Sequence, residues 1–566
     1  MSTRFVRLKS AAFRLAGVYF IVSLLILGLI LLPGYTMTLD MTWGPLRPLP
    51  EGPSNVLPFY WLIAQLQAVV PGWLVQKLIL LGIFMLAGIG AHKLARLALE
   101  PQKGGAPVAW TEQLCYLAGF LFMINPFIYS RYAAGQWLVM LGYALLPWAI
   151  RAVWRLLQRL EWRRALAAAG WLLAICLTSI HTAGFLPLIM LVLLVASGRA
   201  QLGRKLAWLS GVAVGLLLIN AFWLVPSLNG QGRLAQSVAS FDSSQMKAFA
   251  SVGTVLDSVP LSAALLSGFW ADAHNRYVMP QATGVLWGVT ALLVVGLVLL
   301  GARRIWQRRD RLGVALLALG VIAWWLAMGV AWEGSRPLAY WLADNVPFYA
   351  GYREPQKWLM VLAVTYAYCA ALGGDAVLRY LKGRCRPAAK FSRVKSYAIG
   401  AMLLLPFVWT PMQLAGAARQ LGSVQYPAGW QQAKDALAAH GAARDSTVVV
   451  LPWHMYMPMS FTQRTTGNPA SAFFPHDMIT SNNPELRGVP FDAGGPVESY
   501  INAEFLPAQG GVVYGAKPPA QRLNELGVEY IMLLKEGDWR RYEWLQTVPG
   551  LLQVTNNDDI IIYSVN

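Results

Sequence analysis

The stretch "AAFRLAGVYFIVSLLILGLILLP", residues 11–33, carries a single charged residue, Arg14. About 20 apolar residues in a helix cross the roughly 30 Å hydrocarbon core of a bilayer, so this stretch predicts a membrane-spanning helix. It is longer than the apolar region of a secretory signal peptide, and no small-residue cleavage site follows it. We therefore expect it to remain in the protein as its first transmembrane helix.

Similar stretches recur along the 566-residue chain, of which 56% is hydrophobic and 13% is charged. A soluble enzyme of this size would be less apolar, and the 24 tryptophans are typical of membrane interfaces. The apolar stretches predict spans near residues 12–33, 72–92, 110–125, 137–154, 165–181, 183–198, 206–226, 284–302, 312–331, 358–379 and 396–414. The expected fold class is a polytopic α-helical membrane protein with about 11 transmembrane helices.

The net charge of +19 follows this topology, because about 27 of the 46 basic residues fall in short segments that alternate with long, poorly charged ones. Short segments rich in Lys and Arg lie on the cytoplasmic side of a membrane. The N-terminus is therefore expected inside the cell and, after an odd number of spans, the C-terminus outside. Since topology accounts for the basicity, we expect no nucleic-acid partner.

The predicted spans divide the chain into two regions. Residues 1–414 form a membrane domain with large outer loops at 34–71, 227–283 and 332–357. Residues 415–566, with 10 basic and 14 acidic residues, form a small extracytoplasmic domain.

Four segments of this C-terminal region predict an α/β fold. Residues 426–441 have the pattern of a helix closed by Gly441, and residues 446–453 that of a short buried strand. Residues 520–536 predict a helix, a glycine turn and a strand, and residues 550–565 predict a hairpin. Helices that alternate with strands favour a small mixed sheet.

The first outer loop contains the first acidic residue of the chain, Asp40, in "GYTMTLDMTWGPLRPLP", residues 34–50. A carboxylate at the membrane surface can act as a general base toward a hydroxyl, or can hold a divalent cation such as Mg²⁺ or Mn²⁺. The alternative is an aspartate that stabilises a turn or caps a helix.

A second group of polar residues lies at the outer end of the third predicted span, in "INPFIYSRYAAGQWLVMLGYALLPW", residues 124–148. Arg131, Tyr129 and Gln136 at this depth suit a ligand phosphate or a sugar. The alternative is an aromatic belt in which Arg131 extends its charge toward the headgroups.

Three charges precede the tenth predicted span in "NVPFYAGYREPQKWLMVLAV", residues 345–364. Positive charge on the outer side opposes the topological bias, so Arg353 and Lys357 require another explanation. If the helix begins at Arg353, the two cations share one helix face beside free backbone N–H groups, which together attract a phosphate. The alternative is that Glu354 and Lys357 only pair with each other and cap the helix.

Three further residues are weaker candidates for binding substrate. His181 lies at the outer end of the fifth predicted span, where a packing role is equally compatible with the sequence. Asp272 and His274 lie in "FWADAHNRYVMP", residues 269–280, whose spacing matches no metal-binding motif.

Motifs for ATP hydrolysis, dinucleotide binding and zinc proteases are absent from the sequence. The predicted spans also lack internal repeats and a polar track. These absences argue against a transporter or flippase for a lipid-linked glycan, which is the main alternative function. A non-catalytic protein of envelope assembly is the other alternative.

Several of these segments resemble known membrane enzymes. The layout, an inside N-terminus, an acidic residue in the first outer loop and a soluble outer C-terminal domain, is similar to the GT-C superfamily of integral-membrane glycosyltransferases. More narrowly, "TLDMTWGP", "NPFIYSRYAAGQW", "YREPQKW" and "LNELGVEYIMLL…VTNNDDIIIY" resemble segments of polytopic proteins related to the α-(1→3)-arabinofuranosyltransferases.

The resemblance implies a glycosyltransferase in a bacterial or archaeal cytoplasmic membrane, with its active site on the outer face. Such enzymes move a sugar from a polyprenyl-phosphate donor to a glycan, lipid or protein acceptor. The resemblance implies that Asp40 is the catalytic base and that Arg353, Lys357 and Arg131 bind the donor phosphate. Because the first loop has no Asp-x-Asp, the resemblance leaves a metal cofactor open.

Overall fold

A computed structural model of the chain describes residues 2–100, 108–232, 235, 243–274, 276–346, 348–385, 388–483, 485, 494–509 and 517–566. Within these ranges nine helical segments are long and apolar enough to cross a membrane. They comprise α1 (Ser2–Leu27) with η1 (Gly28–Leu31), α3 (Gly72–Leu99), α4 (Thr111–Met123) with α5 (Pro126–Ala133), α6 (Trp137–Gln158), α9 (Leu202–Ile219), α14 (Val285–Arg308), α15 (Arg311–Met328) with η4 (Gly329–Ala331), η6 (Pro355–Trp358) with α17 (Leu359–Arg384), and α18 (Ala388–Trp409).

These segments coincide with nine of the eleven predicted spans, and the polytopic fold class is confirmed. The other two predictions correspond to α7 (Trp162–Cys176) and α8 (Ile180–Ala196), helices of 15 and 17 residues. At 1.5 Å per residue they reach only about 25 Å, less than a full hydrocarbon core. The sidedness expected from the basic residues stays a prediction.

The remaining helices of the membrane region are short. They are α2 (Leu57–Gln67), α10 (Ala221–Leu228), α12 (Ser243–Ala248), α13 (Val259–Ala264), η2 (Trp270–His274), η3 (Pro280–Thr283), α16 (Arg336–Asn345), η5 (Tyr349–Tyr352), η7 (Pro411–Gln413) and α19 (Leu414–Ala418).

The chain forms two compact units. The first comprises Met1–Leu29, Pro50–Phe59 and Leu78–Gln420. The second comprises Ile30–Leu49, Tyr60–Lys77 and Leu421–Asn566, so it contains the segment around Asp40 together with the C-terminal region.

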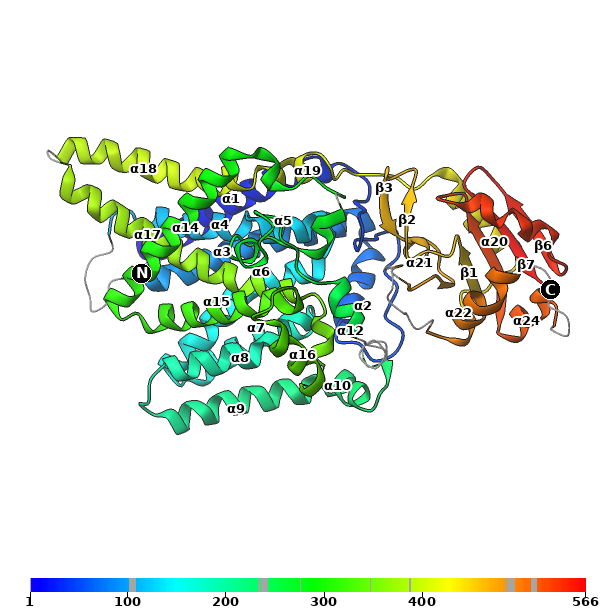
Figure 1. Cartoon of the computed structure of the whole chain (residues 1–566), viewed down its shortest axis with the longest axis horizontal. Helices are drawn as coiled ribbons and strands as arrows, with labels where there is room; N and C mark the ends of the chain where they lie inside the picture. The colour runs from blue at the N-terminus through cyan, green and yellow to red at the C-terminus, as the bar shows by residue number, and fades with distance from the viewer. Residues whose placement is uncertain are drawn as a thin grey trace. The chain divides into compact units, whose positions relative to one another are not determined.

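Helix α17 is largely buried within the first unit and packs against α4, α14 and α15 (Figure 1). Two glycines allow its close approach to α14. A Cβ on Gly301 would lie 1.9 Å from the carbonyl oxygen of Cys369, and one on Gly373 would lie 2.0 Å from that of Leu297. Because small residues let membrane helices pack backbone to backbone, these glycines hold α17 firmly in the bundle.

The second unit contains a five-stranded mixed sheet in the order β4-β1-β5-β7-β6. Its elements are β1 (Thr447–Leu451), β4 (Asp477–Ile479), β5 (Val528–Leu534), β6 (Leu551–Asn556) and β7 (Ile560–Val565), and the separate hairpin is formed by β2 (Tyr456–Met459) and β3 (Arg464–Gly467). Strand β1 pairs in parallel with β4 and β5, whereas β7 runs antiparallel to β5 and β6. The predicted mixed sheet and C-terminal hairpin are confirmed.

Helices cover both faces of this sheet. They are α20 (Ala428–Ala439), α21 (Ala470–Phe473), α22 (Pro496–Tyr500), η8 (Ile501–Phe505), α23 (Leu506–Ala508), α24 (Pro519–Glu525) and η9 (Trp539–Thr547). The side chains of β1 alternate between the two faces: Val448 packs with Trp430 of α20, and Val449 packs with Leu523 of α24. The sheet therefore has two apolar cores, one on each side.

Trp430 is the largest side chain of the core between α20 and the sheet. It is 1% exposed, and its ring packs against those of Phe473 and Phe474. We expect Trp430→Ala to lower the free energy of unfolding of the second unit by about 3–5 kcal/mol, because it opens a cavity. Limited proteolysis of the full-length protein during a thermal ramp would measure this loss.

The matched control is Leu552→Ala on β6, since Leu552 is 58% exposed and should change stability by less than about 0.5 kcal/mol. Equal protease resistance of the two variants would contradict the assigned core.

Candidate functional site

Helix α5 carries the first candidate residues, and Asn125 determines where it begins. The side chain of Asn125 accepts a hydrogen bond from the backbone N–H of Ile128, and Pro126 occupies the first helical position. The amide of Asn125 also donates to the carbonyl of Leu121 and to the hydroxyl of Tyr143. The end of α4, the start of α5 and the first half of α6 are thereby joined.

Arg131, in the last turn of α5, is fully buried. Its Nη1 donates to the amide oxygen of Gln136 at 2.8 Å and to the carboxylate of Glu354 at 3.0 Å, and its guanidinium lies 3.9 Å from the ring centre of Phe269. Its Nε and Nη2 are buried and have no hydrogen-bond partner among the described residues. The alternative interpretation, in which Arg131 extends its charge toward the headgroups, is therefore wrong in this structure.

Glu354 is the shared partner of two cations. Besides Arg131, the ammonium of Lys357 lies 3.5 Å from its carboxylate, and the side chain of Glu354 is only 10% exposed. Burial by itself would raise the pKa of Glu354, but the charges of Lys357 and Arg131 outweigh it and lower the pKa to about 2. Glu354 is therefore ionised and pairs with both cations, so that one negative charge faces two positive ones.

Lys357 also connects the cluster to α8. Its Nζ lies 2.9 Å from Nε2 of His181. Because an ammonium can only donate, Nε2 accepts and the imidazole is neutral, with its proton on Nδ1. The hydroxyl of Tyr352 donates to the carbonyl of His181 at 2.6 Å, and a Cβ on Gly184 would lie 1.8 Å from that hydroxyl.

Arg353 does not share a helix face with Lys357, so that prediction is wrong. The chain forms η5 up to Tyr352, is non-helical at Glu354 (φ −94°, ψ 83°) and re-enters a helix at Pro355. The ring of Pro355 disfavours helical geometry at the residue before it, which separates the two cations. Arg353 instead donates to the buried amide of Gln245 at 3.2 Å.

Asp272 contacts the backbone of Phe269, whose ring lies against Arg131. Its carboxylate accepts from the hydroxyl of Tyr277 at 2.6 Å and from the backbone N–H of Phe269 at 3.0 Å. Burial raises the pKa of Asp272 to about 6, against the lowering effects of the Tyr277 hydrogen bond and the Arg131 charge. Asp272 thus helps to fix the position of Phe269, whose ring packs against the guanidinium of Arg131.

Two other candidates make different contacts. The buried Tyr129 donates its hydroxyl to the carbonyl of Val278 and accepts from Gln420 at 3.1 Å. The exposed His274 has its ring 5.7 Å from that of Trp270.

Asp40 belongs to the second unit, where a tight turn presents it. The backbones of Thr38 and Met41 exchange two hydrogen bonds across it, and the N–H of Gly467 donates to the carbonyl of Leu39 at 2.9 Å. Asp40 is exposed, and its carboxylate accepts a hydrogen bond from the hydroxyl of Tyr456 at 2.5 Å. The turn expected in the alternative interpretation is present, and it presents the carboxylate on a well-held backbone.

A metal site does not emerge from the described residues, among which no group of three His, Cys, Asp or Glu side chains is placed to hold an ion. The predicted Mg²⁺ or Mn²⁺ at Asp40 therefore stays a prediction, and no step proposed below passes through a metal.

Sequence patterns missed several partners of these residues. Tyr352 and Tyr277 each hold a candidate residue through a hydroxyl. Tyr352 directly precedes the three charges, and its position could have identified it. The amide of Gln245, 108 residues from Arg353, carries no signal in the sequence.

The cryo-EM structure of the arabinofuranosyltransferase AftD from mycobacteria is similar to 98% of this chain, with a TM-score of 0.58 and 16% sequence identity. The match covers 40% of the AftD chain, so this chain spans less than half of that length. No protein-family profile matches the sequence, and no curated protein matches it. The similarity establishes a shared fold, and the expected resemblance to a polytopic arabinofuranosyltransferase is confirmed at the level of the fold.

The raised pKa of Asp272 predicts a pH-dependent stability. A carboxyl group with a raised folded-state pKa stabilises the fold below its unfolded pKa of about 4, and this contribution is lost as the pH rises through about 6. Between about pH 4 and pH 7 the free energy of unfolding of the wild type should therefore fall by on the order of 2–3 kcal/mol. We expect Asp272→Asn to lack this fall, and thermal unfolding curves recorded across the same pH range would measure it.

The control is Asp257→Asn, which changes an exposed carboxylate in the same loop between α10 and α14 and should keep the wild-type pH dependence. An unchanged slope for Asp272→Asn would rule out the assigned ionisation.

Proposed function

We propose that this chain is a membrane glycosyltransferase that moves a sugar from a polyprenyl-phosphate donor to a cell-envelope acceptor at the outer face of the cytoplasmic membrane. The fold shared with an arabinofuranosyltransferase supports the class of enzyme. The observation that carries the proposal is the buried cluster of Arg131, Glu354, Lys357 and His181.

The cluster suits a phosphate because its charges do not cancel. Arg131 and Lys357 contribute two positive charges, Glu354 one negative charge, and His181 is neutral. The buried Nε and Nη2 of Arg131 gain partners when an anion binds, and a guanidinium can hold phosphate through two parallel hydrogen bonds. Glu354 acts as a positioning residue, because it holds both cations in place before the donor arrives.

The proposed step is a direct displacement at C1 of the sugar. The bond between C1 and the phosphate oxygen breaks, and its electron pair leaves with the polyprenyl phosphate. The acceptor hydroxyl forms the new C1–O bond and loses its proton to the carboxylate of Asp40. Fixed cations beside the leaving phosphate lower the barrier, since its charge rises in the transition state.

Asp40 carries the proposed role of base, and Asp40→Asn tests it. We expect product formation to fall by about 10²–10⁴-fold, because the amide cannot take the proton. The assay uses full-length protein in lipid nanodiscs with polyprenyl-phosphate pentoses and hexoses, and mass spectrometry detects both polyprenyl phosphate and glycosylated acceptor.

Glu51→Gln is the matched control, since Glu51 is an exposed carboxylate of the same loop and should leave the rate unchanged. Full activity of Asp40→Asn would overturn its role as base. Movement of donor between leaflets without any product would favour the flippase alternative instead.

Lys357→Gln tests the phosphate site. Gln can still contact His181 while Glu354 remains paired with Arg131, so the fold should persist. We expect a rate loss of about 10²–10³-fold, the range for removing one electrostatic contact in the transition state. Arg276→Gln removes an exposed outer cation and should retain wild-type activity, and equal activity of the two variants would contradict the assignment.

A further inference from the structure

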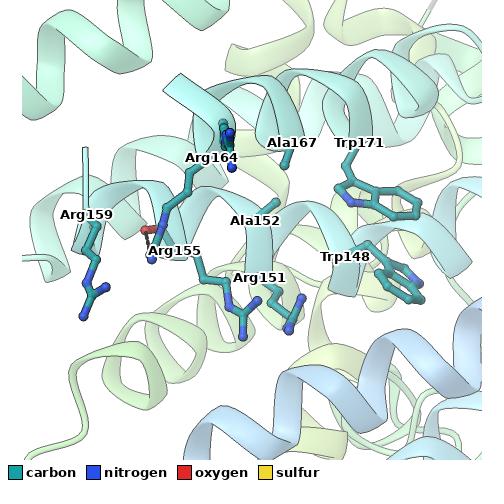
Figure 2. A pocket seen from close by; sticks show the side chains of 9 residues that line it. Trp148, Arg151, Ala152, Arg155, Arg159, Arg164, Ala167 and Trp171 are labelled. Carbon is teal, nitrogen blue, oxygen red and sulfur yellow. Dashed lines mark hydrogen bonds between the residues drawn. The ribbon is translucent and has the colours of Figure 1, made fainter. Parts of the chain in front are cut away.

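A second group of cations lines a cavity of about 570 Å³ between the last turns of α6 and the first turns of α7. The cavity walls include Trp148, Arg151, Ala152, Arg155, Arg159, Arg163, Arg164, Ala167 and Trp171 (Figure 2). A volume of this size is within the usual range of small-molecule sites. The cavity lies at the end of the bundle that the basic segments predict to face the cytoplasm.

These arginines are poorly compensated. Arg151 and Arg155 are four residues apart on one face of α6, where like charges repel, and Arg159 directly follows the last residue of this helix. In the part of the chain that the structure describes, Arg164 is the only one of the five arginines with a carboxylate in ion-pair distance, that of Glu161. The Nε of Arg151 is buried and has no hydrogen-bond partner there.

The opposite end of the cavity is aromatic. The rings of Trp148 and Trp171 stack with centroids 4.7 Å apart, and the ammonium of Lys93 lies 4.4 Å from the centre of the Trp148 ring. Figure 2 shows the tryptophan pair beyond Arg151, on the side away from Arg159. At 1.5 Å per residue, Trp148 lies about 10 Å deeper along α6 than Arg155.

The cavity therefore has a cationic mouth at the helix ends and an aromatic wall farther into the bundle. A soluble anion would use only the mouth, whereas an anionic phospholipid has a phosphate for the arginines and a glycerol and acyl region for the tryptophans. Arginine forks bind phosphate oxygens through paired hydrogen bonds, and basic pockets between membrane helices hold anionic headgroups.

We propose that this cavity binds the phosphate headgroup of an anionic phospholipid from the adjacent leaflet. The proposal is independent of sugar transfer, because it uses none of the residues assigned to that reaction. It also explains why five arginines are gathered at one helical hairpin when fewer would satisfy the topological bias.

The test measures binding of dioleoyl-phosphatidylglycerol to the full-length protein in neutral detergent by native mass spectrometry. Wild-type protein should bind this lipid at least about ten-fold more tightly than phosphatidylcholine. The double variant Arg151→Gln/Arg155→Gln should bind it more weakly than wild type by about ten-fold or more, because it loses charge-assisted hydrogen bonds to the phosphate. Arg159→Gln/Arg163→Gln should weaken binding too, and both of its positions are exposed, so this variant should fold.

The matched control is Arg303→Gln/Arg309→Gln, which removes two exposed arginines from another predicted cytoplasmic segment. It should bind as wild type does. An equal loss in the control, or no loss in either cavity variant, would overturn the proposal. Equally tight binding of glycerophosphoglycerol or inorganic phosphate would show that the ligand is a soluble phosphate and would overturn the lipid assignment.

Discussion

The carboxylate of Glu354 is the shared partner of two buried cations in the first unit. Arg131 from α5 and Lys357 from η6 both contact it, and Lys357 extends the contact to His181 on α8. A cation taken out of water costs several kcal/mol unless an opposite charge accompanies it. One anion between two cations lets α5, η6 and α8 meet inside the first unit, and it leaves the cluster with a net positive charge.

The backbone around this carboxylate determines where the cations point. Pro355 interrupts the helix, so Arg353 turns toward Gln245 while Lys357 turns toward His181. Directly after this turn, α17 is held against α14 through Gly301 and Gly373. Charges that are fixed before a ligand binds stabilise a transition state without the cost of reorganising, which is the physical basis of the proposed phosphate site.

Helix α6 connects two groups of cations that differ in burial and in how many carboxylates accompany them. Gln136, which holds Arg131, directly precedes its first residue, and Arg155 and Arg159 lie at its other end, about 30 Å away. The first group is buried and paired with a carboxylate. The second lines a cavity in which the arginines outnumber their carboxylate partners. This difference is why we assign a reacting phosphate to one group and a resident lipid to the other.

The sequence by itself determined the membrane helices and the C-terminal sheet, because hydrophobic length and strand alternation are local properties. It also identified Arg131, Glu354 and Lys357, since charges beside apolar helices are conspicuous. Only the tertiary structure decided that Arg131 pairs with a carboxylate 223 residues away, that Arg353 diverges from Lys357, and that Tyr456 contacts Asp40. Such pairings depend on how distant segments pack, and no local pattern of residues encodes them.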